Sequence, residues 1–198
     1  VDAIITDPPY GLGKREVSGD ESLEVFRDIL PECYRVLKND SFFITFFSTK
    51  LLPQLFERNP FEYFWQIILY CPGSAVQSPI GFAKYMSCFV FTKGKPKIKR
   101  RGKDIFEDTP GRAVEPDEGW IDHPTPKPKA FIRELLRMFT IEGDLVLDPF
   151  AGSGSIAVAC YQMNRRFIAI EIEERYCRLA CQRLERINPL FCDQAYQK

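Results

Sequence analysis

Four residues near the start of the chain, Asp7-Pro8-Pro9-Tyr10, combine groups that can hold the amine of a nucleobase. They directly follow the apolar run at 1–6, and ligands of open α/β sheets gather where strands end. The prolines have no backbone N–H, which leaves carbonyl oxygens free to accept hydrogen bonds beside the Asp7 carboxylate. The Tyr10 ring offers a face on which an extruded base can stack. Taken alone, the motif also fits a proline turn that ends a strand and carries an incidental tyrosine.

A second motif, DPFAGSGS, begins at Asp148 after an apolar run. Gly152 and Gly154 let the backbone turn sharply and approach a ligand closely, and with Ala157 they match the G-x-G-x-x-G/A pattern of dinucleotide sites. Glu171 follows where an acid that binds ribose hydroxyls is expected, although it also fits a solvated acid at a helix start. Asp148 at the mouth of the loop would repel a pyrophosphate and favour a cofactor with a sulfonium and an ammonium group. The loop therefore predicts S-adenosylmethionine, with a nicotinamide oxidoreductase as the alternative.

Apolar periodicity predicts the elements that position these motifs. Strand-length runs alternate with segments of helical spacing, which predicts a mostly parallel sheet covered on both faces. The runs at 62–70 and 85–93 have no helix between them, so we expect an antiparallel pair there. The other expected strands are 1–7, 40–47, 144–150 and 166–172, and the expected helices are 21–37, 128–139, 155–163 and 173–187.

The 198 residues are expected to form one compact domain with three regions. Region 1–70 contains DPPY and is the expected catalytic half, and region 123–198 contains the Gly-rich loop and is the expected cofactor half. Region 71–122 differs, because it contributes one strand and is otherwise rich in proline and glycine, with a basic run followed by an acidic one. We interpret it as an insert that completes the sheet and recognises the target.

Within this insert, the run KGKPKIKRRGK at 93–103 carries seven positive charges in eleven residues. Lysine and arginine side chains release counterions from DNA and position a duplex without reading its bases. We therefore expect Lys97, Lys99, Arg100 and Arg101 to contact DNA phosphates. The alternative is a solvated charged loop.

The composition limits which other functions are possible. The 27 basic and 27 acidic residues balance, so a DNA-binding surface has to be local. Seven cysteines without a CxxC pair and a single histidine argue against disulfides and against a metal site. No apolar run approaches the ~20 residues of a membrane helix, and no signal peptide pattern precedes the first strand, so we expect a cytoplasmic protein.

The order of the motifs resembles the amino-group DNA methyltransferases, the adenine-N6 and cytosine-N4 enzymes, in the beta-class arrangement where DPPY precedes the cofactor loop. The resemblance covers most of the chain and implies a Rossmann-like fold, S-adenosylmethionine as the cofactor, double-stranded DNA as the partner, and a bacterial or phage enzyme of the restriction-modification type. It is carried by DPPY at 7–10, ECYRVLKNDSFFITFF at 32–47, YMSCFVFTKGK at 85–95, HPTPKP at 123–128, DPFAGSGS at 148–155 and EIEERYCRLACQRL at 171–184.

The resemblance also implies residue roles. Asp7 and Pro8 would hold the target amine, Tyr10 would stack on the base, and Pro9 belongs to the same catalytic motif. Ser155 replaces the threonine common in the family and keeps its hydroxyl. The implied cofactor pocket comprises Asp148, Phe150, Gly152, Gly154, Ser155, Glu171, His123, Thr125 and Lys127.

Several alternatives stay open within this family. Aspartate at position 7 favours adenine N6, and cytosine N4 is the alternative. A Gly-Asp-containing segment usually precedes the DPPY strand in the family, and the sequence starts directly with that strand, so we expect sequence upstream to be missing. An inactive DNA-binding fragment is therefore a further alternative. A homodimer is also compatible with the sequence.

Overall fold

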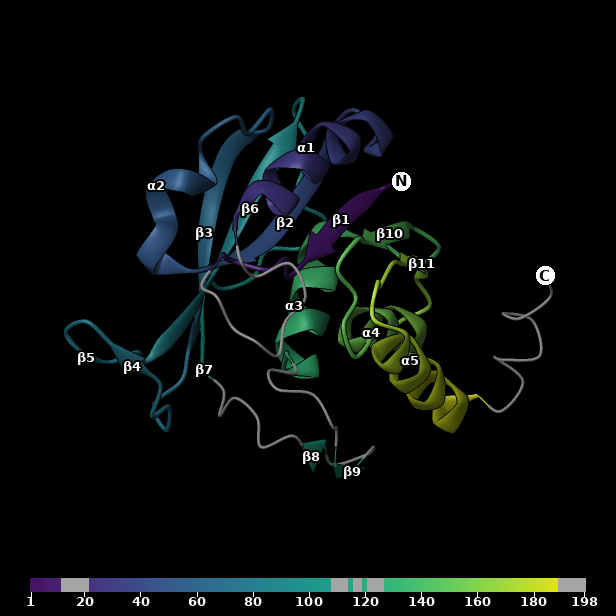
Figure 1. Cartoon of the computed structure of the whole chain (residues 1–198). Helices are drawn as coiled ribbons and strands as arrows, with labels where there is room; N and C mark the ends of the chain where they lie inside the picture. The colour runs from purple at the N-terminus through teal and green to yellow at the C-terminus, as the bar shows by residue number, and fades with distance from the viewer. Residues whose placement is uncertain (12–21, 108–113, 116–118, 121–126, 189–198) are drawn as a thin grey trace.

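The computed structural model describes residues 1–11, 22–107, 114–115, 119–120 and 127–188. Within them, one sheet has the strand order β11-β10-β1-β2-β6-β3-β7 (Figure 1). Neighbouring strands are parallel except at β6, which runs antiparallel to both β2 and β3. The predicted mostly parallel sheet with an antiparallel pair is confirmed. The strands are β1 Ala3–Thr6, β2 Ser41–Phe47, β3 Glu62–Tyr70, β6 Tyr85–Lys93, β7 Ile105–Glu107, β10 Leu145–Asp148 and β11 Arg166–Ala169.

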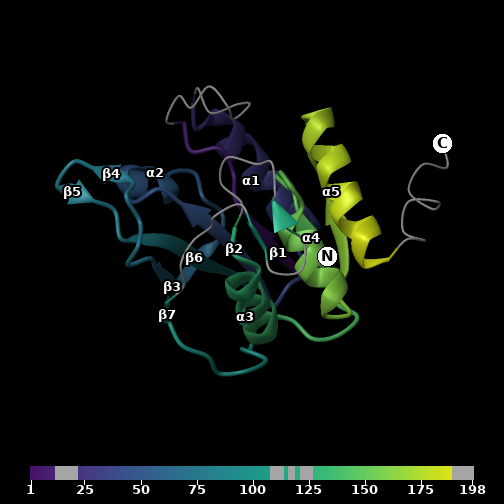
Figure 2. The same cartoon turned by 90° about the horizontal axis from the view of Figure 1, so that it is seen from below.

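Helices cover both faces of this sheet (Figures 1 and 2). Helix α1, Glu24–Val36, lies on one face, and α3, Lys129–Phe139, lies on the other beside α4, Ser155–Gln162. Helix α5, Glu174–Ile187, packs against α4. No helix among the described residues has both the length and the apolar character needed to cross a membrane.

Strand β2 explains why the sheet needs two covered faces. All seven residues of SFFITFF are buried, and successive side chains of a strand point to opposite faces. Phe42 and Phe46 accordingly belong to the core beneath α3, and Phe43 and Phe47 belong to the core beneath α1. A strand without a polar side is typical of a sheet that is buried on both faces.

The four main helices begin and end within a few residues of the predicted bounds, but several short elements were not predicted. Unpredicted elements among the described residues are the 3-10 helix η1 Thr49–Leu51, helix α2 Leu52–Leu55, edge strand β7, and two hairpins, β4 Gln77–Ser78 with β5 Gly81–Phe82 and β8 Val114–Glu115 with β9 Gly119–Trp120. Elements of two to four residues are too short to show a period.

One edge of the sheet collects the ends of β1, β2, β10 and β11. Ile4 lies opposite Leu147 in β10, and Thr6 lies opposite Thr45 in β2. The DPPY turn after β1 and the Gly-rich loop after β10 therefore leave the sheet from neighbouring strands. We call the end of the sheet at which these strands stop the carboxyl edge. The opposite end, where β2 begins and β6 ends, is the amino edge.

Candidate active site

Asp148 lies at the carboxyl edge and joins the two motifs. The Thr6 hydroxyl at the end of β1 donates to Asp148 Oδ1 at 2.8 Å, and the Phe150 backbone N–H donates to the same oxygen at 3.1 Å. The Asp148 side chain is buried, and this burial raises its pKa to about 7, against the lowering effect of both hydrogen bonds. A cation placed beside Asp148 would favour the charged carboxylate.

Both carboxylate oxygens of Asp7 have donors in this structure. The Tyr10 hydroxyl donates to Oδ1, and the Lys127 ammonium donates to Oδ2. The Tyr10 ring lies edge-on to Phe47 with 5.7 Å between ring centroids, and the Lys127 ammonium lies 5.2 Å from the centroid of the Phe46 ring. An amine that binds to Asp7 must therefore displace a donor or use the remaining lone pairs.

The Gly-rich loop has a conformation that depends on its glycines. Gly152 and Gly154 have φ values of 51° and 76°, in the left-handed region that other residues avoid. The Gly152 N–H donates to Glu171 Oε2 at 2.7 Å, and the Glu173 N–H donates to Oε1 at 2.8 Å. These two contacts fix the Glu171 carboxylate beside the loop, just after β11.

The charges of these groups fit a ligand that has a positive centre and a ribose. Asp148 can accept from or neutralise a cation, and the Glu171 carboxylate keeps lone pairs for two ribose hydroxyls. The Gly-rich turn lets the backbone approach the ligand. A pyrophosphate would instead meet the carboxylates Asp148 and Glu171, so the residues fit S-adenosylmethionine better than a dinucleotide.

Three predicted cofactor residues require separate comment. Lys127 precedes α3 and is buried, and its ammonium lies on Asp7 rather than on the Gly-rich loop. The Ser155 hydroxyl is also buried and accepts from Arg183 of α5 at 3.1 Å, so it faces the supporting helix. His123 and Thr125 lie outside the described residues. Pro8 and Pro9 are buried beside Asp7.

The predicted DNA-binding residues lie far from Asp7, at the other end of α3. The basic run starts at the end of β6, where Lys93 pairs with Ser41 at the amino edge. The Lys99 N–H then donates to the Met138 carbonyl at 2.8 Å, at the last turn of α3. Lys97, Lys99, Arg100 and Arg101 are exposed. DNA contact by these residues stays a prediction, and the structure does not bring them together with DPPY.

Two site residues escaped the sequence analysis. Thr6 links the motifs, yet a threonine at the end of a strand reads as ordinary β propensity. Arg183 of α5 donates a hydrogen bond to the Ser153 carbonyl of the Gly-rich loop. The sequence shows only a charged position in an amphipathic helix there. The sequence offers one indication for Thr6. It is a polar residue at the end of an otherwise apolar strand, directly before the DPPY motif.

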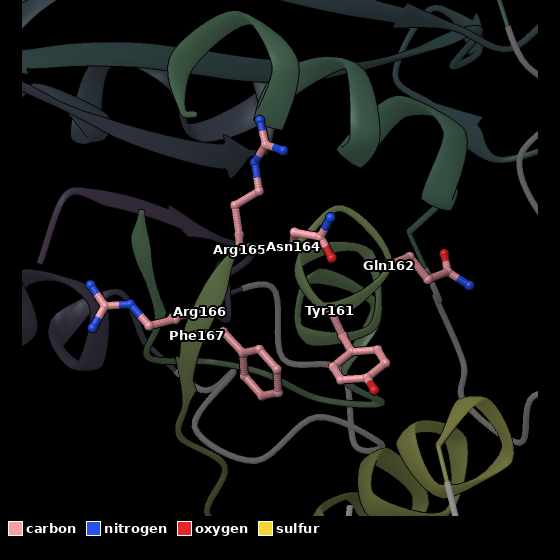
Figure 3. Close-up of a pocket in the computed structure, with 6 residues that line it drawn as sticks. All are labelled: Tyr161, Gln162, Asn164, Arg165, Arg166 and Phe167. Atoms are coloured by element: carbon pink, nitrogen blue, oxygen red, sulfur yellow. The ribbon is translucent and has the colours of Figure 1, made fainter. Parts of the chain in front are cut away.

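One hollow of about 700 Å³ lies away from these residues (Figure 3). Its lining comes from the turn between α4 and β11, at the amino edge. Arg165 and Arg166 point away from the rings of Tyr161 and Phe167 and donate to backbone carbonyls, including those of Thr140 and Gly143. We assign this hollow a structural role. No cluster of three or more metal-ligating side chains occurs among the described residues.

A mostly parallel sheet with a Gly-rich loop after one strand and an acid after the next defines a Rossmann-like α/β protein of the methyltransferase type. The sequence profile of the N6/N4 methyltransferases, described as DNA methylase, matches residues 1–182. The chain therefore belongs to the N6/N4 DNA methylase family.

Individual relatives agree with this assignment. The type II methyltransferase M.HpaI of Haemophilus parainfluenzae is 31% identical, over 93% of this chain and 68% of its own. The DNA adenine methyltransferase YhdJ of Escherichia coli is 26% identical, over 93% of this chain and 76% of its own. The solved structure of an M1.HpyAVI–SAM complex superimposes with a TM-score of 0.72 and 25% identity, over 93% of this chain and 88% of that chain.

Proposed function

We propose that this protein is a site-specific DNA methyltransferase that moves a methyl group from S-adenosylmethionine to the exocyclic amine of a flipped base. The observation that carries the proposal is the hydrogen bond between Thr6 and Asp148. It ties the strand that ends at Asp7 to the strand that ends at the Gly-rich loop. An amine held at Asp7 and a cofactor held at Asp148 would then be neighbours, as direct transfer requires.

S-adenosylmethionine supplies an activated methyl group, so the chain has to bind and align rather than provide a nucleophile. Asp7 accepts an N–H of the target amine and so orients the nitrogen lone pair. Tyr10 stacks on the base and, through its hydroxyl, holds the Asp7 carboxylate. Lys127 pairs with the Asp7 carboxylate and holds it in position until the amine arrives.

The cofactor would be held by the Gly-rich loop, Asp148 and Glu171. The M1.HpyAVI complex with SAM, which has the same fold, supports this choice of cofactor. Double-stranded DNA is the proposed partner because the family consists of DNA methylases. The proposed DNA substrate and bacterial relatives such as the type II methyltransferase M.HpaI support a bacterial cytoplasmic enzyme of the restriction-modification type.

We favour adenine N6 as the acceptor, on the basis of aspartate at position 7 and the similarity to the adenine enzyme YhdJ. Cytosine N4 is the second candidate, because the family includes both types. The two amines present the same donors to Asp7, so the pocket around Tyr10 has to make the distinction.

Transfer of a labelled methyl group to DNA, followed by nucleoside analysis, tests the proposal. We expect labelled N6-methyladenine from the wild-type protein and at least a hundredfold lower rate from Asp7→Ala, because the aligning acceptor is lost. The exposed residue Asp28 on α1 provides a control, and Asp28→Ala should keep the wild-type rate. Labelled N4-methylcytosine would select the second candidate. Absence of label in DNA, with the cofactor bound, would indicate an inactive DNA-binding protein.

A further inference from the structure

A buried arginine of α5 supports the Gly-rich loop. The Arg183 side chain is 1% exposed, and its Nη1 donates to the Ser153 carbonyl at 2.6 Å. The same nitrogen lies 3.2 Å from the Ser153 hydroxyl and 3.1 Å from the Ser155 hydroxyl. Ser153 and Ser155 are themselves buried. Inward-facing oxygens of the loop therefore converge on one guanidinium group.

One turn earlier, α5 contacts the same loop through Ala180. A Cβ atom added at Gly154 would lie only 2.7 Å from the Ala180 Cβ, so the helix packs directly against this glycine. Residues three apart lie on one face of a helix, so Ala180 and Arg183 approach the loop together. The distance between α5 and the loop is thus fixed by close packing at one point and by hydrogen bonds at the other.

Packing alone does not explain an arginine at this position. Burial of a guanidinium costs free energy, and the partners identified in the loop are neutral oxygens rather than carboxylates. An apolar side chain of similar length would fill the space without that cost. Arginine differs because the N–H groups of one guanidinium nitrogen, Nη1, face a carbonyl and two hydroxyl oxygens of the loop at once.

We propose that Arg183 is a positioning residue for the cofactor, because its guanidinium holds the 152–155 loop in the shape that binds S-adenosylmethionine. This inference rests on the proposed function, which assigns the loop to that cofactor. The hydrogen bond from Gly152 to Glu171 extends the effect, because a displaced loop would also release the carboxylate that binds the ribose. Asp7 follows β1 and Lys127 precedes α3, so Arg183 acts on cofactor binding and not on the amine.

Calorimetry with S-adenosylmethionine and initial rates at varied cofactor concentration test this role. Arg183→Met should raise Kd and KM at least tenfold and leave kcat within about threefold of wild type, because the alignment of the amine is unchanged. Arg183→Lys should have a smaller effect, since an ammonium can keep the contact with the Ser153 carbonyl while it loses the one with the Ser155 hydroxyl. Arg178→Met is the matched control, because Arg178 is exposed on the same helix and pairs with Glu174, and its Kd should not change. A folded Arg183→Met protein with Kd within twofold of wild type would overturn the proposal.

Amide hydrogen exchange of the cofactor-free protein gives an independent readout. Residues 151–155 should exchange faster in both Arg183 variants and at the wild-type rate in Arg178→Met. An equal loss of protection throughout α4 and α5 would instead indicate general destabilisation and overturn the positioning role. Failure of the wild-type protein to bind the cofactor would refute the proposed function, while the exchange rates of the loop would still decide the role of Arg183.

A double-mutant cycle keeps the test available if Arg183→Met does not fold. Ser155→Ala should weaken cofactor binding in the wild-type background and have little further effect in Arg183→Lys, because both changes remove the same contact. Additive effects would contradict the proposal.

Discussion

The Tyr10 side chain carries two groups that the proposed mechanism uses differently. Its hydroxyl donates to Asp7, and its ring is the proposed stacking face for the base. We therefore predict that Tyr10→Phe lowers the rate of methyl transfer by about five- to thirtyfold, through the loss of a hydrogen bond worth ~1–2 kcal/mol. Tyr10→Ala should lose a further ~1–3 kcal/mol of stacking.

Steady-state rates with saturating DNA and cofactor would measure this order. Tyr34, which lies on α1 away from Asp7, offers a control, because Tyr34→Phe should keep the wild-type rate. Equal rates for the Phe and Ala variants at position 10 would remove stacking from the mechanism, and a wild-type rate for Tyr10→Phe would remove the hydroxyl.

The raised pKa of Asp148 leads us to predict that cofactor binding depends on pH. Burial raises the pKa of this carboxyl from 3.8 to about 7, so much of the free protein carries a neutral Asp148 below neutral pH. The positively charged cofactor favours the ionised form, so its affinity should rise about tenfold between pH 6 and pH 8 and then level off. Calorimetry across this range is the measurement, and Asp148→Asn should bind weakly with a flatter profile.

The same pKa shift predicts a stability effect of the opposite sign. A raised pKa in the folded state means that the contribution of Asp148 to the free energy of unfolding is fully present below pH 3.8 and is lost as the pH rises through about 7. Asp148→Asn should therefore raise the melting temperature more at pH 8 than at pH 5. A difference that is independent of pH would contradict the assigned pKa.

At the scale of single residues, the sequence predicted which residues lie at the carboxyl edge better than it predicted which way their side chains point. Asp7, Asp148 and Glu171 lie at the carboxyl edge as their positions after strands predicted. The direction of a side chain depends on tertiary packing, which is why the sequence could place Lys127 in the cofactor pocket without revealing its contact with Asp7. For the same reason, a position in the middle of α5 did not reveal that Arg183 faces the loop.

Among the elements, the Gly-rich loop restricts most strongly which residue types its positions can hold. Gly154 combines a φ of 76° with the close approach of Ala180. Gly143 has a similar φ of 81° and open space around it. We predict that Gly143→Ala costs ~1–2 kcal/mol of backbone strain, whereas Gly154→Ala adds ~1–3 kcal/mol of overpacking and weakens cofactor binding.

Thermal unfolding and cofactor titration of these two variants separate strain from steric conflict. The Gly143 variant should bind the cofactor normally, because it lies in the turn before β10 and outside the site. Equal losses of stability and affinity in both variants would mean that the Ala180 contact has no special role.

The position of the basic run 93–103 at the amino edge leads to a prediction about DNA binding. Replacing Lys97, Lys99, Arg100 and Arg101 by alanine should weaken DNA binding and flatten the dependence of log K on log salt by up to about 3.6 if all four contact phosphates. The rate at saturating DNA should change little, because the run lies far from Asp7. An exchange of lysine for arginine and arginine for lysine at the four positions keeps the charge and should keep the slope. An unchanged slope in the alanine variant would leave the run without a role in DNA binding.

Long elements were predictable and short ones were not. The helices at 129–139, 155–162 and 174–187 carry several turns of apolar spacing, so the sequence specifies them within one residue at most ends. Strand β7 has three residues, and it exists because Ile105 to Glu107 pair with the end of β3. Its formation depends on a neighbouring strand rather than on a local pattern.

In the whole molecule, the site is assembled from strands that are distant in sequence and adjacent in one sheet. Strand β1 starts the described chain and β10 lies more than 130 residues later, yet the two lie side by side, with β11 on the far side of β10 (Figure 1). The predicted regions 1–70 and 123–198 therefore contribute strands to a single layer. Ile168 in the outer strand β11 and Ile170 just after it are about half exposed, and Ile105 in the other outer strand β7 is 59% exposed, so both margins of the sheet are less protected than its centre.

The pairing of β1 with β10 also has a consequence for synthesis on the ribosome. Thr6 and Asp148 are separated by 142 positions, so at ~5–20 residues per second the first strand leaves the ribosome roughly 7 to 28 s before its central partner exists. During that time Ile4 and Ile5, which are completely buried in the finished protein, lack half of their cover. Sites built from strands that are distant in sequence form late and slowly, because the entropy cost of closing the loop arises before the stabilising contacts form. Methyl transfer therefore becomes possible only after nearly the whole sheet has been translated, and nascent chains that stop before β10 expose an apolar strand that chaperones can bind.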